Sequence, residues 1–349
     1  MKAKKTVLGR LEKCYSLAML DYNGEKHFLV AAEKVNQCLL FSLDGTPEET
    51  VWEEPGGVMS MVQVPGSNGV FLATWQFYSP NDSAEAKIVI AEPQAENDWR
   101  VRTLAELPFV HRFDILQSNG VNYLIACTLK SGHTYKDDWT SPGKVYAAVL
   151  PEDLSGYGEK HQLPLQVISQ GYTKNHGYYR GNTGPCDNAV ISCESGVYHY
   201  TAPSEGKEKW TLEQLTDTPA SDAVLIDLDG DGEKELFVMS PFHGDTVSIY
   251  KKLQGKYEKQ YECPEKLPFL HAVFGGDING IPTVIAGHRQ GKRQLLAFRF
   301  DGRGGYRKEI LDDSAGPANV LHYLFHGREI LIAANRETDE IAMYELTEE

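Results

Sequence analysis

Short segments in which apolar and polar residues alternate recur along the whole chain. A turn that ends in glycine is followed within a few residues by an apolar run, as in NGEKHFLVAA from Asn23, SNGVFLATW from Ser67 and INGIPTVIAG from Ile278. Alternation with a period of two predicts half-buried antiparallel strands, because successive side chains of a strand point to opposite faces. No segment shows the periodicity of an amphipathic helix, so the pattern predicts an all-β chain.

The strands recur in units of similar length. The turn glycines Gly232, Gly280 and Gly327 are 48 and 47 residues apart. Each unit also has a third alternating segment, and these segments are CLLFSL, KIVIAE, KVYAAVL, VYHYTA, TVSIYK, QLLAFRF and EIAMYEL. Four antiparallel strands in about 45 residues are typical of one blade of a β-propeller. The sequence therefore predicts a single seven-bladed β-propeller domain over residues 1–349.

The two ends of the chain predict how this ring closes. The last unit stops after its third strand, whereas a spare strand precedes the first unit. The sequence of that spare strand, KTVLGRLEK, is similar to the outer strands WTLEQLTD and YRKEILDD. We predict that residues 5–11 complete the last blade as its outer strand, which removes an open sheet edge.

The composition of the chain argues against several classes of function. The formal net charge of -15, without a basic run longer than Lys4–Lys5, argues against a nucleic-acid partner. The six cysteines form no CxxC pair, which favours reduced, buried thiols over disulfides. No segment has the pattern of a signal peptide or the length of a membrane span. We therefore expect a cytoplasmic protein that does not interact with membranes.

Six of the eleven histidines are expected at one end of the ring. In a propeller, each inner strand begins beside the axis at the end to which the loops between second and third strands return. His111 and His271 start equivalent inner strands, with Asp222 at the same place in another unit, and His176 lies just before the fourth unit. The remaining three, on second-to-third-strand loops, are His133, His243 and His288.

Neutral imidazole is the commonest protein ligand for divalent transition metals such as zinc or manganese, and such an ion polarises carbonyl groups. Arginines at the same end suit carboxylates or hydroxyl-rich molecules. The alternative is that each histidine is an ordinary hydrogen-bonded structural residue. A register slip of one residue would also turn the inward side chains outward.

The segment IDLDGDGEKELFV carries a second candidate metal site. Oxygen ligands recur at alternate positions, with Glu233 offering its backbone carbonyl, and the set is Asp227, Asp229, Asp231, Glu233 and Glu235. This spacing wraps a hard cation such as calcium or magnesium. The segment resembles the aspartate-rich turn of the FG-GAP or VCBS repeat family, in which the turn holds calcium. The alternative is an Asp/Gly-rich turn without a tightly bound ion.

Seven blades with central histidines and this turn resemble the propeller domain of fungal aldos-2-ulose dehydratase and, more distantly, the oligogalacturonate lyases. The resemblance covers the propeller alone, since the chain lacks the cupin domains of the dehydratase. It implies a carbon–oxygen lyase that carries out β-elimination on a keto-sugar, keto-glycoside or uronate. The implied metal ligands are His111, His176 and His271, followed by His243 and His288. The implied catalytic residues are Arg112, His133, Tyr178, Tyr179 and Arg180.

Two other functions remain open. A non-enzymatic propeller could bind a protein or a glycan across the same end, and it would need no metal. A hydrolase is disfavoured, because the sequence has no GxSxG motif and no nucleophile with an evident base.

Overall fold

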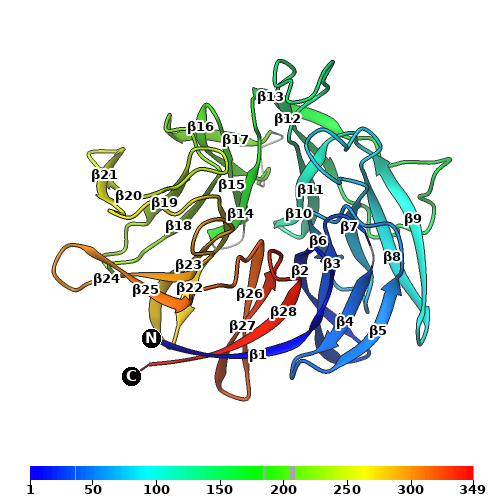
Figure 1. The fold of residues 1–349 in the computed structure, drawn as a ribbon. Helices are drawn as coiled ribbons and strands as arrows, with labels where there is room; N and C mark the ends of the chain where they lie inside the picture. Colours follow the sequence, from blue (N-terminus) through cyan, green and yellow to red (C-terminus); the bar gives the residue numbers. More distant parts are fainter. Residues whose placement is uncertain (36, 184–185, 205–208, 349) are drawn as a thin grey trace.

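The computed structural model describes residues 1–35, 37–183, 186–204 and 209–348 (Figure 1). Within these ranges every regular element is a β-strand. No helix of the described residues is long and apolar enough to cross a membrane. The prediction of an all-β chain is confirmed.

Four of the sheets are antiparallel, have four strands each and follow the order of the sequence. The first contains β2 (Cys14–Tyr22), β3 (Glu25–Ala32), β4 (Cys38–Ser42) and β5 (Pro47–Trp52). The second contains β6 (Met61–Gln63), β7 (Phe71–Trp75), β8 (Lys87–Ala95) and β9 (Asp98–Glu106). The third contains β18 (Asp222–Ile226), β19 (Glu235–Ser240), β20 (Thr246–Leu253) and β21 (Lys256–Glu262). The fourth contains β22 (Leu270–Ile278), β23 (Ile281–His288), β24 (Leu295–Phe300) and β25 (Tyr306–Asp312).

A larger sheet of eight strands consists of two four-stranded halves. One half contains β10 (Val110–Ser118), β11 (Val121–Thr128), β12 (Gly143–Val149) and β13 (Gln166–Tyr172). The other contains β14 (Gly177–Thr183), β15 (Cys186–Cys193), β16 (Gly196–Thr201) and β17 (Thr211–Thr216). A single Cα pair, Ser118 with Cys186, joins the halves.

The remaining sheet contains both ends of the chain. Its order is β1 (Lys2–Arg10), β28 (Glu340–Thr347), β27 (Arg328–Asn335) and β26 (Asn319–Phe325). The outer strand expected over residues 5–11 thus begins earlier, because the antiparallel pairing with β28 already starts at Lys2, opposite Thr347.

The sheets are arranged around a common axis, with their first strands innermost (Figure 1). These inner strands contact their neighbours in the order β2, β6, β10, β14, β18, β22 and β26, and β26 in turn contacts β2. The hydrophobic core lies between neighbouring sheets; one cluster, for example, combines Leu40 of β4 with Phe71 of β7 and Val89 of β8. Successive side chains of each inner strand are buried by the sheets on opposite sides. This packing fixes the start of each inner strand near the axis.

Candidate functional site

Three side chains of the site share the same backbone environment. Tyr15, His111 and His271 are each the extra residue at a register shift between the first two strands of a sheet. Such a β-bulge leaves one residue outside the ladder and re-aims its side chain. In all three strands the bulge lies at the beginning of the inner strand, so it directs an aromatic ring toward the axis.

A five-residue pattern accompanies these bulges. A leucine lies four positions before each bulged residue, and a residue with positive φ lies two positions before it. The positive-φ residues are Lys13 (53°), Phe109 (64°) and Phe269 (64°). Their backbone carbonyls accept hydrogen bonds of 2.9 Å from the amides of Glu33, Leu129 and Arg289, respectively. Left-handed backbone is unfavourable for a bulky residue such as phenylalanine. The surrounding hydrogen bonds therefore hold a local conformation that the sequence alone would disfavour.

Three imidazoles converge at this end of the ring. His176, His243 and His271 each offer one ring nitrogen, and these atoms all lie within 4.8 Å of one another. The Nε2 atoms of His176 and His243 are 3.3 Å apart. His111 packs beside them, with its ring centroid 4.6 Å from that of His176. We call His111, His176, His243 and His271 the histidine cluster.

Hydrogen bonds to the outer ring nitrogens fix the tautomers. Nδ1 of His271 lies 2.6 Å from the carbonyl oxygen of Ala318, and Nδ1 of His176 lies 3.1 Å from both the carbonyl oxygen of Ser221 and Oδ2 of Asp222. Oxygen atoms of these kinds only accept, so Nδ1 carries the proton in both rings. Each neutral ring is then left with its lone pair on Nε2, which faces the other imidazoles.

His243 is held by stacking. Its ring lies between the rings of Phe242 and Phe269, at centroid distances of 4.0 and 4.3 Å and interplanar angles of 23° and 22°. The side chain is half-buried, whereas His176 and His271 are buried. His243 therefore marks the side of the cluster that solvent can reach.

The imidazoles are kept neutral. Burial lowers the pKa of His111, His243 and His271 well below their ordinary value, and neighbouring cationic groups lower it further. Arg112 and Arg289 are two of these groups. Since only the neutral ring can bind a metal, these three rings are in their ligand form at neutral pH.

The donor set fits a divalent transition metal. Three neutral imidazoles with a remaining open position are the protein ligands of many catalytic zinc sites. Metal-binding histidines characteristically donate their other N–H group to a carboxylate or a backbone carbonyl. His176 and His271 have these outer partners in Asp222 and Ala318.

Two predicted residues lie outside the cluster. Both ring nitrogens of His288 are engaged within its own loop, with Nδ1 2.8 Å from the carbonyl oxygen of Gln290 and Nε2 3.1 Å from the amide of Gln294. The prediction of His288 as a ligand therefore does not match its surroundings, because its loop turns the ring back on itself. His133 packs edge-on against Phe109, at a centroid distance of 5.7 Å.

Four further predicted residues line a cavity next to the cluster. Arg112, Tyr178, Tyr179 and Arg180 border a space of about 330 Å³ between the first residues of β2, β6, β10, β14 and β26. We call this space the axial cavity. Burial, and then the nearby carboxylate of Asp114, raises the pKa of Tyr178 well above its ordinary value. Tyr178 thus remains a neutral hydroxyl.

Tyr15 is a site residue that the sequence reasoning missed. Its hydroxyl lies 2.9 Å from Nε2 of His271, the nitrogen left free by the bond to Ala318. Burial raises the pKa of Tyr15 to about 12, so the hydroxyl is the donor of this hydrogen bond. The signal was present in the chain, since Tyr15 follows Leu11 with the spacing by which His111 follows Leu107.

The aspartate-rich turn lies between β18 and β19, at the far end of β18 from Asp222. Carboxylate oxygens of Asp227, Asp229 and Glu235 lie within 4.8 Å of one another. The ammonium group of Lys251 contacts Asp229 and lies 2.6 Å from Asp231 and 3.6 Å from Glu235. The carboxylate side chain of Glu233 is not part of this contact group. Three of the predicted oxygen ligands, Asp229, Asp231 and Glu235, thus lie around a cation that the chain itself supplies.

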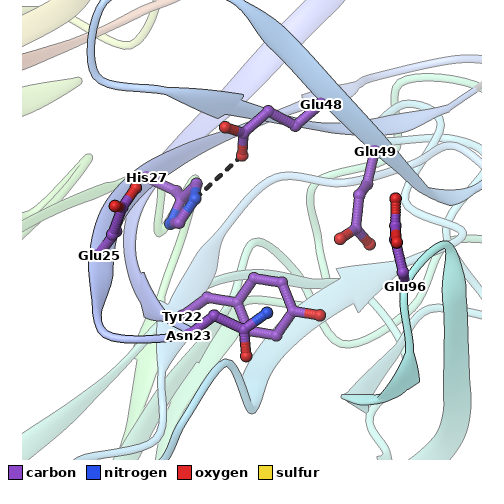
Figure 2. A pocket seen from close by; sticks show the side chains of 7 residues that line it. All are labelled: Tyr22, Asn23, Glu25, His27, Glu48, Glu49 and Glu96. Carbon is purple, nitrogen blue, oxygen red and sulfur yellow. Dashed lines mark ion pairs between the residues drawn. The ribbon is translucent and has the colours of Figure 1, made fainter.

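Another cavity, of about 450 Å³, lies at the β2–β3 turn and is lined by acidic side chains (Figure 2). Nε2 of His27 pairs with Glu48 at 2.9 Å, while Glu25, Glu49 and Glu96 surround the opening. Among the described residues these groups do not form a set of three candidate ligands as close as that of the histidine cluster. Tyr22 at this cavity and Tyr15 at the cluster lie at opposite ends of β2, so the two sites are separate.

Comparison with known proteins bears on the fold. No family model and no curated protein matches the chain. A solved structure, the β-propeller domain of Myceliophteria thermophila Cps50 (Swd1), is similar over 99% of this chain and 100% of its own, with a TM-score of 0.61 and 10% sequence identity. The chain has a β-propeller fold. At this identity the similarity shows the fold alone, and it does not test the resemblance to the dehydratase or to the FG-GAP family.

Proposed function

We propose that this β-propeller binds a small polar ligand at the histidine cluster, with a divalent transition-metal ion as part of the binding site. The observation that carries the proposal is the convergence of His176, His243 and His271 within 4.8 Å. Binding, without catalysis, is the function that best fits a propeller fold found without any match to an enzyme family.

The arrangement of the cluster supports this proposal in two ways. The lone pairs of His176 and His271 are directed inward because their Nδ1 groups are bonded to Asp222, Ser221 and Ala318. His243 is only half-buried, which leaves a side from which an ion and its ligand can enter.

Metal analysis tests the proposal directly. Protein purified without chelator is expected to contain about one equivalent of zinc or manganese, which dialysis against a chelator removes and added Zn²⁺ restores. A protein that contains no transition metal, and that takes up none from a micromolar Zn²⁺ solution, would contradict it. In that case a metal-free binding surface for a protein or glycan would be the better description.

A lyase is the second candidate, favoured by the hydroxyl of Tyr15 beside Nε2 of His271. A bound ion would supply polarisation of a substrate carbonyl. Burial raises the pKa of Tyr15 to about 12, so its hydroxyl keeps the proton that it now donates to Nε2 of His271. An ion bound to this Nε2 would release the hydroxyl to donate to a substrate oxygen. A screen of keto-sugars and uronates for ultraviolet-absorbing unsaturated products tests this candidate. A metal-loaded protein that forms none of these products would leave binding as the function.

We further propose that the eight-stranded sheet is two blades, which gives a ring of seven. The two halves share only a single Cα pair, and the other neighbouring sheets are joined by packing. Such weak pairing between the halves supports two separate blades. The pairing of β1 with β28 supports closure of the ring by the N-terminal strand. A truncated chain that starts after Arg10 tests it, because β28 would then be an exposed edge and the truncated protein should be less stable.

A further inference from the structure

Arg112 projects into the axial cavity. It directly follows the bulged residue His111, and its guanidinium carbon lies 5.8 Å from the ring centroid of Tyr15. The hydroxyl of the same tyrosine reaches His271. The positive charge of Arg112 also lowers the pKa of His111, His243 and His271, although burial is the larger cause. Arg112 therefore lies close to the histidine cluster.

The guanidinium of Arg112 has donors to spare. Its Nη1 donates to the carbonyl oxygen of Met59 at 2.7 Å. Within the part of the chain that the structure describes, no other hydrogen bond and no carboxylate partner is recorded for it. A guanidinium group has five N–H donors arranged in a planar fork, so most of its hydrogen-bonding capacity faces the cavity.

Other arginines near the axis have carboxylate partners. Arg180 pairs with Asp114 and Asp187. Arg289 pairs with Glu337 at 2.8 Å, and Arg336 pairs with Glu33 and Glu337. Arg112 differs from them in a protein whose net charge is -15, where carboxylates are abundant. A partly buried guanidinium without a counter-charge suits an anionic group brought by a ligand.

The rest of the cavity suits a small molecule with hydroxyl groups. Ser60 and Asn319 supply polar side chains, while Met61 and Val320 supply apolar surface. The carboxylate of Asp114, which also lines the cavity, is paired with Arg180. The volume of about 330 Å³ lies in the range of small-molecule pockets.

We propose that the axial cavity binds a small molecule that carries a carboxylate, and that Arg112 pairs with this carboxylate through its planar fork. The inference rests on the proposed binding function and adds the class of ligand. Arg112 is thus a determinant of specificity, because it would favour an acid over a neutral molecule of the same shape.

Calorimetric titration of the full chain with D-glucuronate and with its neutral methyl ester tests the inference. Both probes have the same ring and hydroxyl groups, and they differ in the charge of the carboxyl group. We expect the acid to bind about tenfold more tightly than the ester, as one charge-assisted pair implies. Equal affinities, or no saturable binding of either probe, overturn the inference.

Variants identify the residue responsible. Arg112→Gln is expected to weaken binding of the acid about tenfold and to leave binding of the ester unchanged, whereas Arg328→Gln, at the exposed first position of β27, should change neither. Unchanged binding of the acid by a folded Arg112→Gln protein overturns the role of Arg112. If that variant does not fold, Arg112→Lys keeps the charge and removes the planar fork, and an intermediate loss is expected.

The titrations are carried out on chelator-treated and on Zn²⁺-loaded protein. A preference for the acid in a protein that takes up no zinc would overturn the metal site and leave the inference standing. Normal uptake of zinc with no preference for the acid would overturn the inference and leave the metal site standing.

Discussion

Two groups of potential metal ligands lie at the two ends of β18. They differ in the charge of the ligand side chains and of their neighbours. At the start of β18, Asp222 supports His176 in a cluster of neutral imidazoles. Beyond its end, Asp227 and Asp229 belong to a cluster of carboxylates. The carboxylates surround the ammonium group of Lys251, whereas the imidazole nitrogens of His176 and His243 face each other at 3.3 Å.

This difference leads us to propose a metal ion at the histidine cluster rather than at the turn. Hydrogen bonds to Asp229 and Asp231 raise the pKa of Lys251, so one cationic side chain already offsets part of the negative charge of the turn. At the histidine cluster, burial and then the charges of Arg289 and Arg112 lower the pKa of His271, whose Nε2 accepts a hydrogen bond from the hydroxyl of Tyr15. Geometry alone, three ligand atoms within 4.8 Å, is the same at both places. The charge that surrounds the atoms distinguishes them.

The largest effect is expected for His271→Ala. The loss of one of three ligands should lower Zn²⁺ affinity at least about a hundredfold, since the ion keeps too few protein donors. His288→Ala is the matched control, because this histidine of the neighbouring strand makes its hydrogen bonds within its own loop. Competition with a chromophoric chelator measures the affinity. Equal losses in the two variants would show that His271 is not a ligand.

Asp222→Asn is expected to weaken Zn²⁺ binding about tenfold to a hundredfold. The carboxylate accepts a hydrogen bond from Nδ1 of His176 and raises the basicity of the opposite nitrogen, and an amide does this less well. Asp153→Asn, in an exposed turn, should have no effect. Zinc affinity that is unchanged in Asp222→Asn would mean that His176 does not need its outer partner.

Lys251→Met tests the role of the lysine at the aspartate-rich turn. Removing the ammonium group should leave Glu235 buried without a counter-charge and lower the free energy of unfolding by about 1–3 kcal/mol. It should also raise Ca²⁺ affinity about tenfold, because the ion no longer competes with the side chain. Lys252→Met, at the next and more exposed position, is the control. The contrary result is that the unaltered protein binds Ca²⁺ as tightly as Lys251→Met does. That result would support the aspartate-rich turn as a calcium site despite the lysine.

The sequence predicted the architecture better than the site. Strand periodicity located the inner strands, and with them His111, His176 and His271 at one end of the ring. Periodicity does not report where a loop turns a side chain, so His288 was expected in the cluster, although Gln290 and Gln294 satisfy its ring.

Two other features needed three-dimensional information. Tyr15 was not predicted because the predicted site was built from histidines. The Leu-x-x-x spacing that precedes each bulge would have indicated it. Lys251 lies 16 residues after Glu235 in the chain, and only the pairing of β19 with β20 brings it to the turn. Alternating patterns thus predict which face a residue lies on, whereas partners from neighbouring strands depend on register.

The smallest effect concerns pH. The folded protein holds His111, His243 and His271 neutral because burial lowers their pKa, whereas the unfolded chain protonates them below about pH 6.5. The unfolded state therefore binds more protons as the pH falls, and stability decreases. Between pH 7.5 and 5.5 each such histidine should lower the free energy of unfolding by about 1 kcal/mol.

Urea unfolding of chelator-treated protein at the two pH values measures this change. His111→Gln should reduce the difference by about 1 kcal/mol, the contribution of one neutral ring. His161→Gln, at an exposed position, should leave it unaltered. A pH dependence that is the same in all three proteins would mean that His111 becomes protonated in the folded state. The cluster would then carry a charge of its own, as the aspartate-rich turn does, and the contrast between the two ends of β18 would disappear.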